Sequence, residues 1–313
     1  MFFKILDAIR AHDTIIIHRH KKPDGDALGS QIGLKHILLE NFPCKQVFMV
    51  GDGAGHYSFM DDSVMDSVPD SAYEGALAII LDCGSANLIS DERYTQAAET
   101  VRFDHHIFCG QIAQLEMVDT SYESCCGLVA DFAQKCGLGL NPAAAKALYT
   151  GMITDSGRFR FDSTTANTFR VAAFLMDQGI DTNDIFRHLY ADDFESRRRK
   201  AEFTLKIQFT PKNVAYIYTT LDALRATGAD SFSISRGMVG TMSDLKGVDI
   251  WVNFTETEEG ILCELRSSLY NINPIAVKYG GGGHAKASGA TVPDRATAMA
   301  MLQDLDAMIG EAQ

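Results

Sequence analysis

Short apolar runs alternate with amphipathic segments along roughly the first two-thirds of the chain. The runs at 14–18, 45–50, 76–82 and 101–106 are too short for helices and are typical of buried strands. The segment between the second and third runs, 51–73, is polar and predicts a loop with short helical pieces. Amphipathic stretches predict helices at 4–11, 27–40, 125–136, 143–153, 165–178 and 182–190. Strands that alternate with helices predict an α/β domain with a parallel sheet and right-handed crossovers.

The pattern changes after residue 191. A charged segment, 192–207, contains Arg197-Arg-Arg-Lys200 and predicts an exposed connecting helix, since a charge run is usually a solvated face. Beyond it, strands are predicted at 214–219, 248–255, 261–267 and 287–292, followed by a final helix at 295–309. A length of 313 residues fits two domains. We expect an N-terminal domain at 1–191 and a smaller α+β domain at 208–313.

Composition narrows the class of protein. The chain is 46% hydrophobic and 22% charged, as in ordinary globular proteins, and no apolar run has the length of a membrane span. Its seven cysteines form no C-x-x-C pair, which favours a reducing, cytoplasmic location. The net charge of −13 argues against non-specific binding of long duplexes, which depends on many phosphate contacts. A nucleotide or a very short oligonucleotide in a pocket remains compatible with that charge.

The turn after the first strand carries the first candidate chemistry. His20, Asp24 and Asp26 form an H-x-x-x-D-x-D pattern, and Pro23 and Gly25 bend the backbone between the carboxylates. One imidazole and two carboxylates suit Mn²⁺ or Mg²⁺. The site would lie beyond the carboxyl end of a strand, as is usual in open α/β sheets. Aspartate is also a common turn and helix-cap residue, so this motif alone does not decide between the two interpretations.

Three further segments strengthen the metal hypothesis. Asp82 follows the third strand, Asp104-His105-His106 follows the fourth, and Asp155 ends a predicted helix. Two metals with one shared carboxylate can be built from these groups, and two-metal sites activate water for phosphoryl chemistry. Each residue alone could be a cap or a buried structural group. Six plausible ligands in four segments favour two divalent ions.

A second cluster of candidates lies near the C-terminus. Glycines 280–283 precede His284 and follow Arg266 and Ser267. Successive glycine amides can approach an anion closely, and arginine offers a fork suited to phosphate. In the first domain, Arg158 could pair with phosphate, whereas Phe159 and Phe161 could stack on a base but are more often core residues.

Together these motifs resemble the DHH phosphoesterases that carry a C-terminal DHHA1 domain, and most closely the NrnA-type subfamily. The segments that carry the resemblance are His20-Lys-Lys-Pro-Asp-Gly-Asp26, Leu81-Asp82, Asp104-His-His106, Thr154-Asp155-Ser-Gly-Arg158, Leu265-Arg-Ser-Ser268 and Gly280-Gly-Gly-Gly-His284. The match covers essentially the whole chain. It implies a catalytic DHH domain, a substrate-binding DHHA1 domain, and an active site in the cleft between them.

The resemblance also implies a role for each residue. One Mn²⁺ would be held by His20, Asp24 and Asp82, and the other by Asp26, Asp82, His105 and Asp155. His106 would lie beside the scissile phosphate. Asp104 would either orient a neighbouring imidazole or make a purely structural hydrogen bond. Substrate binding is expected from Arg158, Arg266, Ser267, Gly281, Gly282, Gly283 and His284.

The implied activity is hydrolysis of short RNA oligonucleotides and of 3′-phosphoadenosine 5′-phosphate (pAp). Alternatives with the same metal motifs are a phosphodiesterase for linear dinucleotides such as pApA and a family-II inorganic pyrophosphatase. The pyrophosphatase is disfavoured because its basic C-terminal signature is missing from the sequence. A non-catalytic nucleotide-binding regulator is a further alternative, against which the complete ligand set argues. No membrane partner is expected, and the family is compatible with a homodimer.

Overall fold

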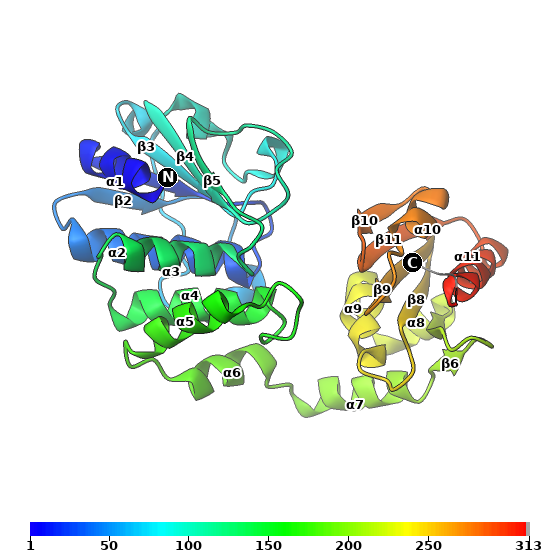
Figure 1. The fold of residues 1–313 in the computed structure, drawn as a ribbon. Coiled ribbons are helices and arrows are strands. Elements are labelled where there is room, and N and C mark those ends of the chain that lie inside the picture. Colours follow the sequence, from blue (N-terminus) through cyan, green and yellow to red (C-terminus); the bar gives the residue numbers. More distant parts are fainter. Residues whose placement is uncertain (311–313) are drawn as a thin grey trace. The chain divides into compact units, whose positions relative to one another are not determined.

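A computed structural model describes residues 1–310 of the chain and divides it into two compact units, Met1–Ala191 and Asp192–Gln313 (Figure 1). The first unit contains, in order, α1 (Phe2–Ala11), β1 (Thr14–His18), α2 (Gly25–Asn41), β2 (Gln46–Met49), β3 (Leu77–Leu81), β4 (Glu99–Asp104), β5 (Leu115–Val118), α3 (Cys125–Lys135), α4 (Pro142–Asp155), α5 (Ala166–Met176) and α6 (Thr182–Tyr190). Short 3₁₀ helices η1 (Gly55–Tyr57), η2 (Asp70–Tyr73), η3 (Ala86–Leu88) and η4 (Glu92–Gln96) interrupt its loops.

The first unit is organised around a parallel five-stranded sheet in the order β2-β1-β3-β4-β5. Successive side chains of β1 project to opposite faces of the sheet, and both faces are buried. Ile15 and Ile17 join the core formed with α1 to α4, whereas Ile16 packs on the opposite side with Tyr73 and Val68. Helices therefore cover one face of the sheet, and the segment with the 3₁₀ helices covers the other. The predicted α/β domain with a parallel sheet is confirmed.

Helix α4 packs against α2, α3 and α5 (Figure 1). Its contact with α2 is close because glycines recur every four residues on α2. A Cβ added at Gly29 would lie 2.6 Å from the carbonyl oxygen of Ala147, and one at Gly25 would lie 2.4 Å from Thr154 Oγ1. On α4, a Cβ at Gly151 would lie 3.0 Å from the Cα of Asp26. This contact fixes the start of α2 against the end of α4.

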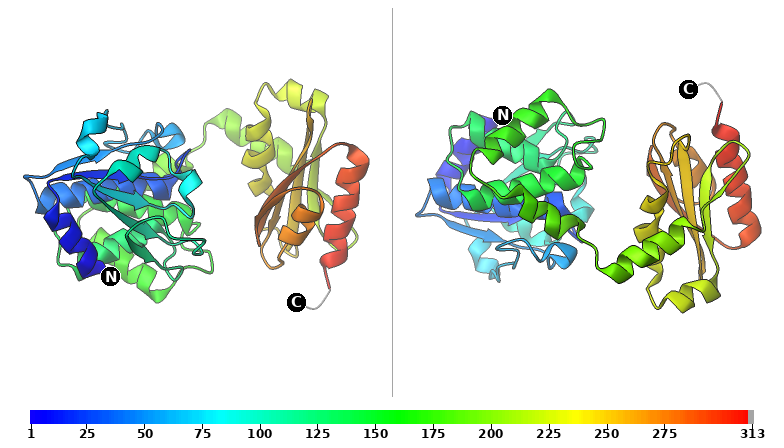
Figure 2. Two further views of the ribbon diagram at one scale, coloured as in Figure 1. Left: turned by 90° about the horizontal axis from the view of Figure 1, so that it is seen from above. Right: turned by 90° about the horizontal axis from the view of Figure 1, so that it is seen from below.

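The second unit begins with α7 (Phe194–Thr204) and contains β6 (Gln208–Phe209), β7 (Ala215–Thr219), α8 (Leu221–Thr227), α9 (Ser231–Met238), η5 (Val239–Met242), β8 (Ile250–Thr257), β9 (Gly260–Ser267), α10 (Asn273–Lys278), β10 (Gly282–His284), β11 (Ala287–Val292) and α11 (Arg295–Met308). Its mixed six-stranded sheet has the order β10-β11-β9-β8-β7-β6, with β7 and β8 parallel and the other pairs antiparallel. Side chains of α10 and α11 share one core with this sheet, and those of α9 and η5 share another, so helices cover both faces (Figure 2).

Several elements differ from the predicted ones. Strand β5 was missed because four half-buried residues, Leu115–Val118, give too short an alternation. Helices α8, α9 and α10 were also missed, since each has eight residues or fewer. Part of the predicted glycine loop is strand β10, which pairs with β11 through backbone bonds that side-chain patterns cannot reveal. Within residues 1–310, no helix combines the length and apolar character needed to cross a membrane.

Candidate metal centre

The carboxyl ends of three neighbouring strands bring the predicted metal ligands together. His20 follows β1, Asp82 follows β3, and His105 follows β4. Because β3 lies between β1 and β4 in the sheet, Asp82 lies between the two histidines. Asp82 has a φ of +54°, a left-handed conformation that aspartate tolerates and that turns the chain sharply at the strand end.

The two oxygens of Asp82 face two different groups of side chains. Asp82 Oδ2 lies 3.3 Å from His20 Nε2, which is 3.7 Å from Asp24 Oδ1. Asp82 Oδ1 lies 3.5 Å from His105 Nε2. That nitrogen is also 3.7 Å from Asp26 Oδ2 and 3.4 Å from Asp155 Oδ2. A buried carboxylate that is shared in this way has the arrangement expected of a ligand between two cations.

Helix ends hold the remaining carboxylates. Asp24 is the N-cap of α2, and its Oδ1 accepts hydrogen bonds from the amides of Asp26 and Ala27 at 3.1 and 3.0 Å. The cap interpretation of Asp24 is therefore confirmed, and the capping oxygen is also the one that lies near His20. Asp26 is buried and accepts hydrogen bonds from the first two amides of α3, those of Cys125 and Cys126, at 2.7 and 2.8 Å. Asp155 is the last residue of α4.

Two of these positioning features were missed in the sequence. The amides that hold Asp26 belong to the buried, vicinal cysteines 125 and 126, and a backbone amide leaves no signal in the residue type. Ser124 caps α3 through Gly127 N, so the start of this helix had a visible sequence signal. The second feature is the spacing of Gly25, Gly29 and Gly33 on α2, which predicts a close helix contact once a partner helix is known.

The donor set fits divalent cations. Ligands bonded to one ion at about 2.1 Å lie roughly 3.0–3.5 Å apart, and the contacts around His105 Nε2 are 3.4–3.7 Å. Within the described part of the chain, the buried Asp82 Oδ1 has no hydrogen-bond partner. An unpaired buried oxygen is costly, and a cation would satisfy it. Imidazole with several carboxylates is a set that suits Mn²⁺ and related ions.

The pKa shifts of the site residues also favour bound cations. Burial, with the charges of Asp82 and Asp155 nearby, raises the pKa of Asp26 well above its usual range. Burial also raises the pKa of Asp155 to about 6. Burial alone would lower the pKa of His20, but hydrogen bonds to Asp24 and Asp82 raise it to about 11. Three clustered carboxylates therefore need positive charge, and a metal can supply it in place of protons on histidine.

His106 differs from the other site histidines. Its Nδ1 donates a hydrogen bond to Asp104 Oδ1 at 2.8 Å, and the side chain is 43% exposed. The same nitrogen lies 3.5 Å from Asp82 Oδ1, so His106 could also be grouped with Asp82 and His105 around a metal. The shorter bond commits Nδ1 to Asp104. Asp104 therefore contacts a neighbouring imidazole, a geometry that both of its expected roles require.

Arg158 lies on an unusual turn just after Asp155. Gly157, Arg158 and Phe159 have consecutive φ values of +57°, +65° and +62°, which costs energy at the two non-glycine positions. The exposed guanidinium of Arg158 stacks over the ring of Tyr190 at 4.9 Å. Phe159 packs against the core, whereas Phe161 is 59% exposed. Of the two aromatic candidates, only Phe161 is therefore available for stacking on a base.

In the second unit, Arg266 and His284 lie in one row of the sheet. Ala287 of β11 pairs with Arg266 on one side and with His284 on the other. Directly paired residues project to the same face, so the two cationic candidates flank a small alanine. Arg266 is partly occupied, because it donates to Glu264 Oε2 at 3.1 Å and to the carbonyl of Leu265 at 2.8 Å.

The other substrate-binding candidates in this unit are Ser267 and the glycines before His284, and most of them make structural contacts. Ser267 Oγ donates to the carbonyl of Asp249 at 2.9 Å and accepts from the amides of Leu269 and Tyr270 at 3.1 and 2.7 Å, so no donor is left for a ligand. A Cβ at Gly281 would lie 2.1 Å from Gly289 O, and one at Gly283 would lie 2.6 Å from Ala287 O. Packing explains these two glycines. Gly282 has open space around its Cα.

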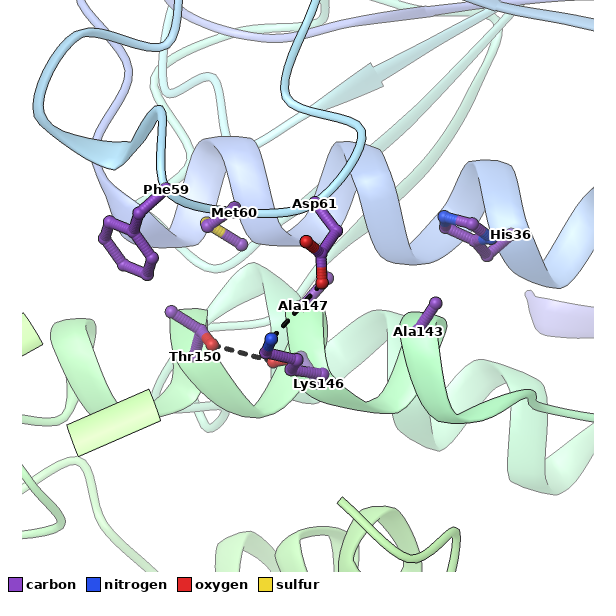
Figure 3. Close-up of a pocket in the computed structure, with 8 residues that line it drawn as sticks. All are labelled: His36, Phe59, Met60, Asp61, Ala143, Lys146, Ala147 and Thr150. Carbon is purple, nitrogen blue, oxygen red and sulfur yellow. Dashed lines mark hydrogen bonds and ion pairs between the residues drawn. The ribbon is translucent and has the colours of Figure 1, made fainter. Parts of the chain in front are cut away.

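A small pocket between α4 and segment 55–62 is separate from the metal-ligand set (Figure 3). Lys146 points towards Asp61 there, at 3.2 Å, and also pairs with Asp184 at 3.1 Å. The cavity volume is about 10 Å³, which holds about one water molecule. A nucleotide therefore cannot bind in it.

Comparison with known proteins gives matches in both units. Residues 14–152 match the N-terminal domain of the DHH family, and residues 213–311 match the DHHA1 domain. A Bacillus subtilis protein named bifunctional oligoribonuclease and PAP phosphatase NrnA is 33% identical over 98% of both chains. A probable protein of the same name from Streptococcus mutans is 35% identical over 92% of this chain and 93% of its own.

A solved structure of an exopolyphosphatase-related protein from Bacteroides fragilis is similar with a TM-score of 0.86 and 24% identity. The match covers 98% of this chain and 95% of the other. At this identity, the similarity concerns the fold.

Proposed function

Because the chain belongs to the DHH family of phosphoesterases with a C-terminal DHHA1 domain, we propose that it hydrolyses short RNA oligonucleotides to mononucleotides and dephosphorylates pAp to AMP. The single observation that carries the chemistry is the position of Asp82, whose two oxygens face His20 and His105 separately. Relatives similar over nearly their whole length support the choice of substrates.

We propose two divalent cations, Mn²⁺ or Mg²⁺, with Mn²⁺ as the preferred ion. His20, Asp24 and Asp82 would hold one, and Asp26, Asp82, His105 and Asp155 would hold the other. When bound, such a pair supplies an activated water and offsets the charge that develops on the phosphoryl oxygens. Seven free cysteines support a reducing, cytoplasmic setting for the enzyme.

His106 would contact the scissile phosphate. Its hydrogen bond to Asp104 raises the pKa of the imidazole, which favours the protonated form. With Nδ1–H held by Asp104, Nε2–H is the atom that can donate to a phosphoryl oxygen. Arg158 would add a guanidinium that stabilises charge on the same phosphoryl oxygens. In the DHHA1 domain, Arg266, the amide of Gly282 and His284 would bind the remaining phosphate.

An assay of metal-loaded protein tests this proposal. Initial rates are measured with Mn²⁺ on pAp, on pApA and on RNA of two to five nucleotides and of about 24 nucleotides, with Asp82→Ala as the inactive control. We expect release of AMP from pAp and of mononucleotides from the short RNAs, with much slower turnover of the long one. Activity on pApA alone would instead identify a linear-dinucleotide phosphodiesterase. No turnover of any substrate, despite bound metal, would favour a nucleotide-binding regulator.

A further inference from the structure

A buried arginine lies behind the Asp104–His106 pair. Arg102 is on β4, two residues before Asp104, and both side chains are fully buried. Residues two apart in a strand project to the same face, so the Arg102 guanidinium reaches Asp104 directly, through Nη2 and Oδ2. The other carboxylate oxygen, Oδ1, accepts from His106 Nδ1 at 2.8 Å. Arg102, Asp104 and His106 therefore form one chain of charge-assisted hydrogen bonds.

The same guanidinium also anchors the loop that contains the site histidines. Arg102 Nη1 donates to the carbonyl of Gly110 at 3.2 Å and to Glu116 Oε1 at 3.3 Å. Glu116 lies directly opposite Arg102 in the β4–β5 pairing. Its Oε1 accepts the amides of Ile112 and Ala113 at 2.7 and 3.1 Å. Arg102 thus holds the later part of the segment that follows His106, directly at Gly110 and indirectly through Glu116.

We propose that Arg102 is a positioning residue for His106, which acts by fixing Asp104 and the 105–113 loop so that the His106 Nε2 faces substrate. This inference rests on the proposed function of His106. Without Arg102, Asp104 could turn away from His106, since among the described residues Arg102 is the group that holds its second oxygen. The imidazole would then lose the hydrogen bond that fixes its orientation.

The chemistry of arginine is needed for this role. Three acceptors, on Asp104, Gly110 and Glu116, surround one planar group, and a guanidinium can bond to all three. A lysine ammonium keeps the charge but has one nitrogen. It can retain Asp104 or the loop in good geometry, but not both. Arg102→Lys is therefore the informative variant, because it keeps a buried positive charge beside Asp104 and Glu116 but removes the fork that holds both.

The first test separates kcat from KM in the metal-loaded, full-length enzyme. We expect Arg102→Lys to lower kcat by about 10-fold and Arg102→Met by up to about 100-fold, the range seen for residues that orient a catalytic partner. KM and the amount of bound metal should change less than about 2-fold. Glu116→Gln is the matched control, because its amide oxygen can still accept the loop amides and Arg102 still contacts Asp104. It should retain kcat within about 3-fold.

A double-mutant cycle shows whether Arg102 acts through His106. In a His106→Ala background, Arg102→Lys should lower kcat by less than about 2-fold, since the group that it positions is gone. A full, independent loss in that background would contradict the inference and indicate a general structural role.

A spectroscopic readout works even if the enzyme has another substrate. In ¹⁵N-histidine spectra of the protein loaded with Mg²⁺, which unlike Mn²⁺ is diamagnetic, the signals of His106 are assigned by their loss in His106→Ala. We expect a hydrogen-bonded Nδ1–H of His106 in the wild type, and loss or exchange broadening of its signal in Arg102→Lys and Arg102→Met. An unchanged His106 signal in both variants would overturn the positioning role. Failure of the substrate assays alone would leave this result intact and count only against the proposed function.

Discussion

At the scale of single residues, Asp82 is the group on which the whole metal centre depends. We expect Asp82→Ala to lose both metals and at least about 100-fold in kcat, because each candidate ion would lose a ligand and the remaining carboxylates would repel one another. His20→Ala is the matched variant, since it removes a ligand from one group only. Metal content after dialysis should fall from two ions to fewer than one in the first variant and to about one in the second. Two retained ions in Asp82→Ala would refute the bridging role.

His18 provides a prediction about stability. Its side chain is fully buried, and burial lowers its pKa from 6.5 to about 4 against the smaller opposing effect of Asp91. The unfolded chain therefore binds this proton at a higher pH than the folded protein does. As pH falls from 6.5 to 4, the unfolded chain takes up this proton and the folded protein does not. The free energy of unfolding therefore falls by about 3 kcal/mol over this range.

Urea unfolding at several pH values checks this, with His18→Asn as the comparison. The side chain at position 18 of the variant does not titrate. The difference in the free energy of unfolding, wild type minus variant, should therefore fall as pH drops from 7 to 4. A difference that stays constant with pH would contradict the assignment. The absolute stability of the variant does not matter, because only the slope with pH is compared.

The site residues illustrate what sequence can and cannot reveal. His20, Asp24, Asp26, Asp82, His105 and Asp155 stand out because charged groups that follow apolar runs are visible in one dimension. Arg102 and Glu116 did not stand out, because they lie inside strands and meet only through the β4–β5 register. Ser267 was expected to bind substrate because of its neighbours in the sequence. Its hydroxyl also closes a turn, a contact that can be recognised only once the local backbone is known.

At the scale of elements, the contact between α2 and α4 sets the distance between two of the candidate metal ligands. Asp26 is near the start of α2 and Asp155 is at the end of α4, so their separation follows the distance between the two helices. Gly29→Ala would place a methyl group 2.6 Å from the Ala147 carbonyl, which is backbone and cannot rotate away. We expect a net loss of about 1–2 kcal/mol in the free energy of unfolding and about 10-fold weaker Mn²⁺ binding.

Gly33→Ala is the control on the same face of α2. The atoms nearest to its methyl group would be those of the Leu148 side chain, with Cγ at 2.5 Å, and a side chain can shift where a backbone carbonyl cannot. The higher helix propensity of alanine offsets part of that cost. Calorimetric titration with Mn²⁺ measures the metal affinity of both variants. Equal affinities in the two would show that the helix contact does not control the metal site.

The prediction of elements was most reliable for long or strongly apolar segments. The four strands β1 to β4 and the helices α1 to α7 are all confirmed, with ends that differ by a few residues. Strand β6 has only two residues and β10 is Gly282–His284, so neither has a side-chain pattern to detect. Tertiary pairing, and not local preference, makes these segments into strands.

At the scale of the whole molecule, the charge distribution agrees with a small substrate. The arginine and lysine run on α7 is paired with acidic groups around it, as in Arg198 with Glu195 at 2.7 Å and Lys200 with Asp192 at 2.8 Å. It is thus a solvated helix face, as expected. With a net charge of −13, affinity has to come from a few cations placed at the ligand.

The candidate metal ligands and the candidate substrate-binding His284 belong to different units. All the candidate metal ligands lie before residue 192, whereas His284 lies in the second unit. His284→Ala should therefore leave two bound metals and an almost unchanged kcat. KM for pAp should rise about 10-fold or more, as expected when a hydrogen bond to a charged phosphate is lost.

Ser267→Ala is the matched variant in the same sheet. Because its hydroxyl serves the turn, it should lower the free energy of unfolding by about 1–2 kcal/mol and leave KM unchanged. Steady-state kinetics and metal analysis of both variants separate the outcomes. An equal fall of kcat and kcat/KM in His284→Ala would place this histidine in the transition state, and the second unit would then contribute to chemistry as well as to binding.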